Sequence, residues 1–445
     1  MTLSSFADLN DFVRPELRRI EALISRRQLT EAASALTQLG RSAPTDWRVP
    51  LIGIQLAEAS GNLIAARAAA QRTHEMAPTA PLAQIELART LSRDGEHERA
   101  VDLARQATAT ADDADELILS RAVAIGTAAR EWTFVHDCLQ KAYRANPDDL
   151  NVVRALGFNA LCRQSFDEAI QWYSTCLEQD GNDELALSGH GWAHLQSGLL
   201  ARAEADYARL VQLHPASAEY AYFLSLARGE TPEAQPVSLV LRTVEGYASR
   251  FDDWVSGALG YYAPRRVAEM IREAYPKGNG SVLDLGCGTG MLAAYLGPIS
   301  GSIVGVDLSK TMLDQAANRH YDRLHHCDLR DALRDTPDMQ YEVIAACDVF
   351  IYLGKLDEHV KQAARILRPN GRLIATFEQS DDLPCVLRPT ERFAHSTEHV
   401  QQVFAAAGLI DVYIEPLTLR HEAGVPVPGF IAVGHRPLQS GTIAN

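Results

Sequence analysis

Long uncharged apolar runs are missing from this sequence. No stretch of ~18 or more such residues occurs, which excludes a membrane-spanning helix. The first residues, MTLSSFADLNDFVRPELRR, lack the apolar centre of a signal peptide, so we expect a cytoplasmic location. The 7 cysteines include no C-x-x-C pair, which predicts reduced thiols rather than a disulfide scaffold. Walker A and G-x-S-x-G motifs are also absent, so kinase and serine-hydrolase functions lack their required parts.

Basic residues are outnumbered. The chain has 42 Lys and Arg against 57 Asp and Glu, a net charge of −15. An acidic surface repels phosphate backbones, so we expect neither nucleic acid nor a membrane as a partner. Apolar residues make up 47% of the 445 residues, which is ample material for packed cores. At ~100–200 residues per domain, the length predicts two or three domains.

The first half of the chain repeats with a period of 34 residues. Prolines that follow helical patterns stand 34 residues apart, or twice that, and small residues recur in parallel. The prolines are Pro44, Pro78, Pro147 and Pro215, and the small residues are Ala32, Ala66, Ala100, Ala169 and Ala203, with Val135 in the gap. In the two best units Gly157 aligns with Gly191, and Tyr173 aligns with Tyr207. Small residues at fixed positions let two antiparallel helices approach closely, and the aromatic ring fills the space against the next pair.

This pattern resembles the tetratricopeptide repeat (TPR), with about six units over residues 13–217. The resemblance implies an all-α superhelix over residues 1–227 with a concave groove. One interpretation is capture of a peptide or protein partner in that groove. The alternative is a spacer or a dimerisation scaffold, which would make the protein a homo-oligomer. The fold alone does not decide between them.

After a linker at residues 228–239, the rhythm changes to alternating strands and helices over residues 240–445. Short apolar runs at 281–285, 302–308, 341–347 and 372–377 predict strands separated by helices. We therefore expect an α/β domain with a mostly parallel sheet.

A glycine turn follows the first of these strands, in SVLDLGCGTGMLAAYLG (281–297). Asp284 precedes the glycines, and Asp307 ends the next strand, 17 residues after Gly290. Dinucleotide-binding folds place glycines similarly, and that fold is the alternative. The G-x-G-x-G spacing and the two acids fit S-adenosylmethionine better, because this cofactor has an ammonium group and a ribose but no phosphate. Asp284 would attract the ammonium, and Asp307 would accept hydrogen bonds from the ribose hydroxyls.

The turn resembles the V-L-D-x-G-C-G-T-G pattern of class I, Rossmann-like S-adenosylmethionine-dependent methyltransferases, apart from Leu285. The resemblance implies that Asp328 and Leu329 lie at the adenine, and that Asp348, Val349 and Tyr352 border the transferable methyl group. The cofactor-binding residues implied are Asp284, Gly286, Cys287, Gly288, Gly290, Asp307, Leu308, Asp328, Leu329, Asp348 and Val349. His325, His326 and Cys327 are adjacent, but no second cluster at ligand spacing accompanies them, so we expect no metal.

Three further segments, at 244–264, 391–409 and 419–436, resemble those of bacterial predicted methyltransferases that carry TPR repeats. Tyr247 and Phe251 are then lid residues that contact substrate, or else simply pack an amphipathic helix. Arg420 and Glu422 either anchor a charged substrate or pair with each other.

For catalysis we take His395 as the first candidate base, because a histidine can be neutral near pH 7. Tyr352 and Glu378 are further options, and a carboxylate or thiol acceptor needs no protein base. The sequence thus predicts a methyltransferase acting on O or N of a small-molecule, carrier-bound or protein acceptor. The alternative is a TPR scaffold whose cofactor site only regulates binding.

Overall fold

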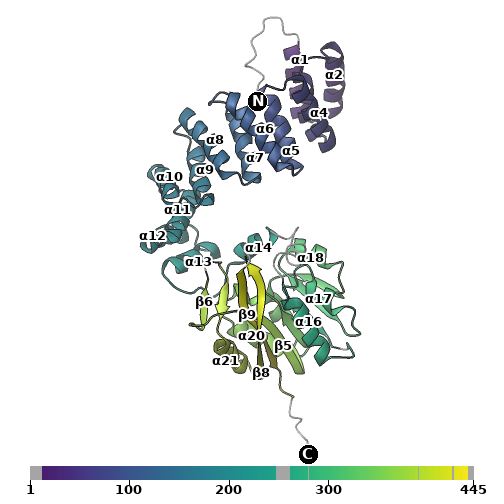
Figure 1. Cartoon of the computed structure of the whole chain (residues 1–445), viewed down its shortest axis with the longest axis vertical. Helices are drawn as coiled ribbons and strands as arrows, with labels where there is room; N and C mark the ends of the chain where they lie inside the picture. The colour runs from purple at the N-terminus through teal and green to yellow at the C-terminus, as the bar shows by residue number, and fades with distance from the viewer. Residues whose placement is uncertain (1–12, 247–260, 279, 389, 423–424, 439–445) are drawn as a thin grey trace, which may run out of the picture. The chain divides into compact units, whose positions relative to one another are not determined.

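The computed structural model describes residues 13–246, 261–278, 280–388, 390–422 and 425–438. The chain divides into two compact units between Leu213 and His214 (Figure 1). This division lies before the boundary at residue 227 that the repeat pattern predicted. No helix in the described part of the chain is long and apolar enough to cross a membrane.

The first unit consists of antiparallel helix pairs joined by short turns. Side-chain caps start several helices: the carboxylates of Asp115 and Asp183 accept hydrogen bonds from the backbone N–H groups of Ile118 and Ala186. The pairs are α1 (Val13–Ser25) and α2 (Leu29–Ser42), α3 (Arg48–Ala59) and α4 (Leu63–Met76), α5 (Pro81–Arg93) and α6 (His97–Thr110), α7 (Glu116–Ala128) and α8 (Trp132–Ala145), α9 (Leu150–Cys162) and α10 (Phe166–Gln179), and α11 (Glu184–Gln196) and α12 (Leu200–Leu213). Six described pairs thus match the six predicted units.

Small residues bring the helices of a pair together, as the repeat predicted. The alanine series is fully buried, from Ala32 to Ala203. A Cβ added at Gly157 would lie 2.8 Å from the ring of Tyr173, and one at Gly191 would lie 2.9 Å from the ring of Tyr207. No larger residue fits at either position without movement of the ring, so each glycine makes room for the tyrosine of its own helix pair.

The second unit is an α/β domain. Its helical elements are α13 (Ala218–Ala227), α14 (Val237–Glu245), α16 (Ala263–Ala274), α17 (Met291–Leu296), α18 (Lys310–Ala316), α19 (Leu329–Asp335), the 3₁₀ helix η2 (Phe350–Tyr352), α20 (Asp357–Ile366) and α21 (Thr397–Ala406). Its strands are β1 (Val282–Leu285), β2 (Ile303–Asp307), β3 (Arg323–His326), β4 (Tyr341–Ala346), β5 (Leu367–Gln379), β6 (Cys385–Leu387), β7 (Phe393–His395), β8 (Ile410–Glu422) and β9 (Val425–His435).

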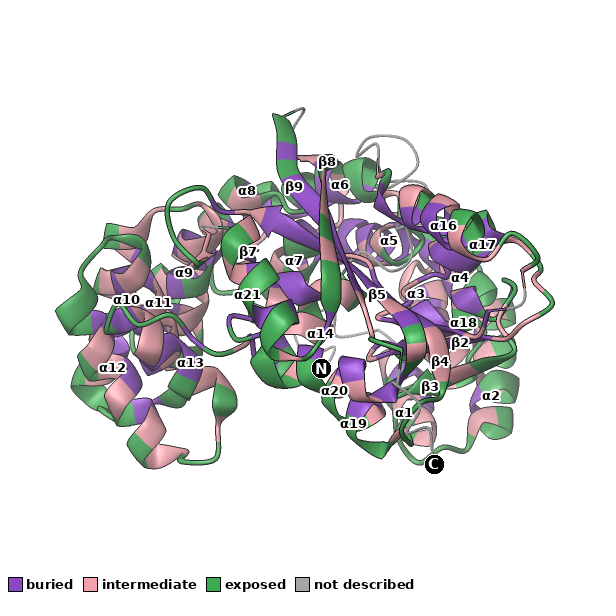
Figure 2. Cartoon of the chain, turned by 90° about the horizontal axis from the view of Figure 1, so that it is seen from below, coloured by how far each residue is buried: buried purple, intermediate pink, exposed green. Residues whose placement is uncertain are grey.

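The sheet has a parallel core in the order β3-β2-β1-β4-β5, which confirms the strands predicted from the apolar runs. β9 pairs antiparallel with β5, β8 pairs with β9, and the β6–β7 hairpin joins the end of β5. Figure 2 shows β9 and much of β5 in the colour of buried residues. Because the strand order reverses between β1 and β4, loops leave the carboxyl ends of these two strands in opposite directions. Such a switch point is where open α/β sheets bind ligands.

The predicted linker is part of the second unit rather than a free connection. The backbone N–H of Gln235 donates to the carbonyl of Tyr352 at 2.9 Å, and Ala234 forms a β-bridge with Leu353. Helix α14 also begins at Val237, inside the predicted linker. The sequence of this segment gave no sign of these pairings, because their partners lie more than a hundred residues away.

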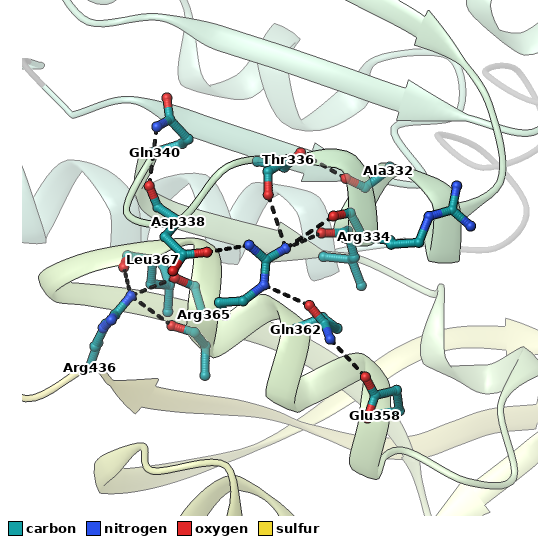
Figure 3. A network of polar contacts seen from close by, with 12 residues as sticks. Ala332, Arg334, Thr336, Asp338, Gln340, Glu358, Gln362, Arg365, Leu367 and Arg436 are labelled. Carbon is teal, nitrogen blue, oxygen red and sulfur yellow. Dashed lines mark hydrogen bonds and ion pairs between the residues drawn. The ribbon is translucent and has the colours of Figure 1, made fainter.

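An arginine network joins α19 and α20 beside the first residues of β5 (Figure 3). The guanidinium of Arg365 donates to the carbonyls of Leu333 and Thr336 at 2.8 and 2.9 Å and pairs with Asp338. Arg436 donates in turn to the carbonyl of Arg365 at 2.6 Å. These contacts satisfy carbonyls that the last turns of α19 and α20 leave open. The network thereby holds the C-terminal turns of α19 and α20 together beside the amino end of β5.

Candidate functional site

A cavity of about 240 Å³ lies within the second unit, at the carboxyl ends of β1, β2 and β4. The sequence-predicted residues that line it are Asp284, Gly286, Cys287, Gly288, Asp307, Leu308, Asp328, Leu329, Asp348, Val349, Tyr352 and Arg420. Residues separated by more than a hundred positions therefore meet at one site. This is the edge of the sheet where the switch point predicts ligand binding.

The glycine turn between β1 and α17 needs glycine for two different reasons. Gly286 has φ +64° and its Cβ would lie 2.4 Å from Cγ2 of Val349, so a side chain there would fill the space beside the cavity. Gly290 has φ +86° and caps the first turn of α17. Gly290 does not line the cavity; a Cβ there would lie 2.8 Å from Arg319. Gly290 therefore shapes the turn, whereas Gly286 shapes the wall.

Asp284 is the next-to-last residue of the buried strand β1, and it is 2% exposed. The hydroxyl of Tyr321 donates to its carboxylate at 2.6 Å. Burial raises the pKa of Asp284 to about 7, the Tyr321 hydrogen bond opposes that rise, and the nearby Asp307 adds to it. A buried carboxyl without a cationic partner of its own is well suited to receive a positively charged ligand group. Sequence analysis missed Tyr321, since it belongs to no motif.

Asp307 ends β2 and holds the glycine turn in place. Its Oδ2 accepts from the backbone N–H of Gly288 at 2.8 Å, and its Oδ1 accepts from that of Ser309 at 2.8 Å. Burial raises the pKa of Asp307, and these backbone donors work against the rise. A carboxylate offers about four lone-pair positions, so acceptor capacity remains on both oxygens toward the cavity.

Asp328 caps α19, and its Oδ1 accepts from the backbone N–H of Arg330 at 2.7 Å. His359 on α20 also lines the cavity, and the charges of Asp328 and Arg330 act on it. Burial lowers the pKa of His359, so its ring is neutral at neutral pH. Sequence analysis overlooked this histidine, which stands alone in a polar helix.

A buried ion cluster closes the other side of the cavity. Arg420 on β8 is 4% exposed and donates to Asp348 at 3.1 Å and to Glu378 on β5. Asp348 has φ +53°, and its backbone N–H donates to the hydroxyl of Thr376 at 2.8 Å. Arg420 thus pairs with Asp348 in the loop after β4 and with Glu378 on β5, and its proposed roles with Glu422 or a charged substrate stay predictions.

Tyr261 lies beside this cluster and also lines the cavity. Burial raises the pKa of its phenol well above the usual value, and the charges of Asp348 and Cys347 add to the rise. The group is therefore a neutral hydrogen-bond donor at any physiological pH. Tyr261 belongs to the segment 244–264 that sequence analysis singled out, but it was not among the candidate site residues.

The other candidates lie elsewhere. His395 on β7 is fully buried outside the cavity lining, and its Nε2 contacts the carbonyl of Leu353 at 2.9 Å. Burial lowers its pKa to about 4, so the geometry favours a structural role for His395 over that of a base. Glu422 ends β8, where its backbone pairs with that of Val425. Tyr247 and Phe251 lie outside the described residues.

Comparison with known proteins agrees with this geometry. A family model described as a methyltransferase domain matches residues 283–373, which run from β1 into β5. The match thus falls on the strands of the second unit that surround the cavity, and it gives the likeness of this region to a methyltransferase domain.

Two curated relatives and one solved structure illustrate the likeness. The chain is 28% identical over 126 residues to a ubiquinone biosynthesis O-methyltransferase of Bradyrhizobium diazoefficiens, covering 26% of this chain and 49% of that protein. It is 34% identical over 119 residues to methyltransferase GfsG of Streptomyces halstedii, covering 25% and 42%. The crystal structure of a Burkholderia thailandensis 1,6-didemethyltoxoflavin-N1-methyltransferase has a TM-score of 0.36 and 17% identity, covering 47% of this chain and 93% of that one. We draw no conclusion from that structural likeness. The chain spans less than two thirds of the length of the curated relatives that it matches first.

The cavity has three features that suit S-adenosylmethionine, the cofactor that the sequence resemblance implies. Asp284 supplies a buried carboxyl for the ammonium group. Asp307 keeps acceptor capacity for ribose hydroxyls. Gly288 adds no side chain at the cavity, and a Cβ there would meet no atom within 4 Å, which leaves space beside the turn.

Proposed function

We propose that the protein is an S-adenosylmethionine-dependent methyltransferase that methylates an oxygen or a nitrogen of its acceptor. One observation carries the proposal: three aspartates from the ends of β1, β2 and β3 line a single cavity beside the glycine turn. Their placement matches the three polar parts of the cofactor, which are the ammonium group, the ribose and the adenine amino group.

In this proposal Asp284 binds the ammonium group, and the turn formed by Gly286, Cys287, Gly288 and Gly290 leaves room for the methionyl chain. Asp307 binds the ribose hydroxyls, with Leu308 against the sugar. Asp328 and Leu329 hold the adenine edge. His359 lines the same cavity, and the charge of Asp328 acts on its ring. We therefore place this neutral ring near the adenine.

The bound cofactor supplies a methyl group that its sulfonium already makes electrophilic. The protein then has to align the acceptor in line with that methyl group and exclude water. Val349 and Asp348 border this position, since they follow β4 and line the cavity. The ion pair with Arg420 and the contact with Thr376 keep the Asp348 carboxylate in one orientation. A fixed carboxylate there favours an acceptor that is neutral or cationic.

The acceptor's own proton needs a path to solvent or to a protein group. Tyr352 lines the cavity and is the candidate we retain from the two catalytic residues predicted from sequence. Tyr261 donates a hydrogen bond and positions the acceptor oxygen or nitrogen. Such residues would affect turnover more strongly than cofactor binding.

We further propose that the helix pairs of the first unit are tetratricopeptide repeats that bind a partner or mediate assembly. This proposal is supported by the 34-residue period and by the repeated contact between a glycine and a tyrosine in the last two helix pairs. The acceptor is then a small metabolite, or a carrier-bound or protein group recruited by the repeats.

Methyl-labelled cofactor and a host lysate separated by size would test the proposal. The full chain should transfer label, and Asp307→Ala should lose it. Label in the large fraction identifies a protein or carrier-bound acceptor, and label in the small fraction identifies a metabolite. Cofactor binding without any turnover across lysates and conditions would instead support a scaffold with a regulatory cofactor site.

A further inference from the structure

Two histidines and one aspartate meet in the last helix pair of the first unit, and none of them lines the cavity of the second unit. His190 and His194 lie one turn apart on α11, so their side chains share a face of that helix. Asp206 lies on α12, which packs against α11 (Figure 1). We call these residues the His-His-Asp cluster. In the described part of the chain it is the only group of three or more His, Cys, Asp or Glu with ligand atoms within 4.8 Å of one another.

The distances in the cluster are those of metal ligands. Nδ1 of His190 lies 3.0 Å from Oδ2 of Asp206, and Nδ1 of His194 lies 2.9 Å from the same oxygen. Zinc binds such atoms at about 2.0–2.2 Å, so two ligands of one ion stand ~2.9 Å apart in an octahedron and ~3.3 Å apart in a tetrahedron. The observed separations lie at the short end of this range, and a single ion can contact all three atoms after small side-chain shifts.

The surroundings hold the ligands in place. The side chains of His194, His190 and Asp206 are 3%, 14% and 12% exposed, so they are shielded but not sealed from solvent. The hydroxyl of Ser174 on α10 lies 3.2 Å from Nε2 of His190. A partner on the second ring nitrogen orients a metal-ligating histidine and leaves Nδ1 free to bind.

A second feature of the cluster is that both imidazoles converge on one oxygen. Oδ2 of Asp206 lies within hydrogen-bond distance of Nδ1 of His190 and Nδ1 of His194, and the centroids of the two rings are 4.1 Å apart. Three potential ligand atoms from two helices therefore point to the same place.

We propose that the His-His-Asp cluster binds one divalent transition-metal ion, zinc in the first place, through His190, His194 and Asp206. Two imidazoles and one carboxylate suit zinc, cobalt and nickel, whereas calcium and magnesium take oxygen ligands. The ion links α11 to α12. Three protein ligands leave a fourth position for water or for a group from a bound partner. The sequence-based expectation of no metal considered only His325, His326 and Cys327, and this site lies elsewhere.

Zinc binding to the full-length protein tests the proposal. The protein is stripped with a chelator and titrated with Zn²⁺ against a chromophoric competitor, and thermal unfolding is followed with and without Zn²⁺. The unaltered chain should bind one equivalent at this site and unfold at a higher temperature when zinc is present. Asp206→Asn and His194→Gln should each weaken that equivalent by about 100-fold or more, and Ser174→Ala by about tenfold, as expected for a group that orients a ligand.

His136→Gln is the matched control. His136 on α8 also lies near a carboxylate, 3.7 Å from Glu168, but without a third ligand. It should leave zinc binding and the thermal shift unchanged. The same zinc affinity and thermal shift in Asp206→Asn, His194→Gln and the unaltered chain would overturn the proposal.

A measurement on the unaltered protein covers the case in which a ligand variant fails to fold. Co²⁺ bound at the site should give a visible absorption band typical of nitrogen and oxygen ligands, and Zn²⁺ should displace it. A spectrum dominated by thiolate-to-cobalt charge transfer, or no uptake of Co²⁺, would overturn the assignment.

Discussion

Asp307→Asn should weaken S-adenosylmethionine binding by about 30- to 150-fold. The carboxylate accepts from the backbone N–H of Gly288 in the glycine turn and from that of Ser309 after β2, at 2.8 Å each, and keeps acceptor capacity toward the cavity. The amide retains one acceptor oxygen and presents an NH₂ group where the other oxygen was. One ribose hydrogen bond is lost and the other no longer involves a charge. At about 1.5–3 kcal/mol for a hydrogen bond to a charged group, the combined loss is about 2–3 kcal/mol, and each 1.4 kcal/mol is tenfold in affinity.

The same variant should also destabilise the second unit. One backbone N–H of the turn then faces an NH₂ group, and a buried donor left unpaired costs about 1–3 kcal/mol. Asp322→Asn is a matched control, because Asp322 accepts from the backbone N–H of Ile303 at 2.7 Å, at the other end of β2 and outside the cavity lining. It should lower stability without changing cofactor affinity.

Isothermal titration calorimetry on both variants, together with chemical unfolding, separates the two effects. The expected result is weaker binding in Asp307→Asn alone, at a temperature where both variants are folded. Binding of unaltered strength by a folded Asp307→Asn would refute the ribose assignment. Equal weakening in both variants would refute it as well, since the loss would then come from the stability of β2.

Cofactor affinity should also rise about eightfold between pH 6 and pH 7.5, because burial raises the pKa of Asp284 to about 7 and only the ionised carboxylate attracts an ammonium group. The sign for the ligand-free protein is the reverse: the stability that this group contributes is complete below about pH 4 and is lost as the pH rises through about 7. Calorimetry across this range should give a flat profile for Asp284→Asn, and a flat profile in the unaltered chain would contradict the assignment. Arg365→Met should lower the free energy of unfolding by about 2–3 kcal/mol, because it removes charge-assisted hydrogen bonds to buried carbonyls. Arg368→Met removes a half-exposed pair and should change it by less than about 1 kcal/mol in urea unfolding, and equal effects would show that the network adds nothing. Gly157→Ala should destabilise the first unit by about 1–2 kcal/mol, since its Cβ would lie 2.8 Å from a tyrosine ring, whereas Gly53→Ala, with 3.7 Å to its nearest neighbours, should stabilise it by about 0.5–1 kcal/mol. The same sign for both in thermal unfolding would refute the packing argument.

Much of the fold could be predicted because the informative signals are local. The 34-residue period indicated where each helix pair begins. The glycine and the tyrosine that recur in the last two units lie against each other within each unit. Apolar runs likewise predicted β1, β2, β4 and β5. The β8–β9 hairpin was not predicted as strands, although its final pairing on β5 completes the sheet. Its residues alternate only weakly between apolar and polar, and Pro416, Pro426 and Pro428 interrupt the pattern.

The candidate site was predicted best for residues that stand at, or directly after, the carboxyl ends of the strands. The carboxyl ends of β1 and β2 contain Asp284 and Asp307, and the glycine turn follows β1 directly. Because these two strands are neighbours in the sheet, their ends meet at the cavity. His395 was misjudged because its environment depends on the short strand β7, whose pairing with β5 buries it. No local pattern encodes such a contact.

The sequence by itself determined the helical repeat, the parallel sheet and the position of the glycine turn, because each follows from periodicity or from the conformational freedom of glycine. Only the tertiary structure decided which charges face one another. Arg420 meets Asp348 from the loop after β4 and Glu378 from β5, and Asp206 meets His190 and His194 because α12 folds back against α11. Charges and ligands act over a few ångströms in space, whereas the chain separates these groups by a dozen to more than seventy residues, so only packing brings them together.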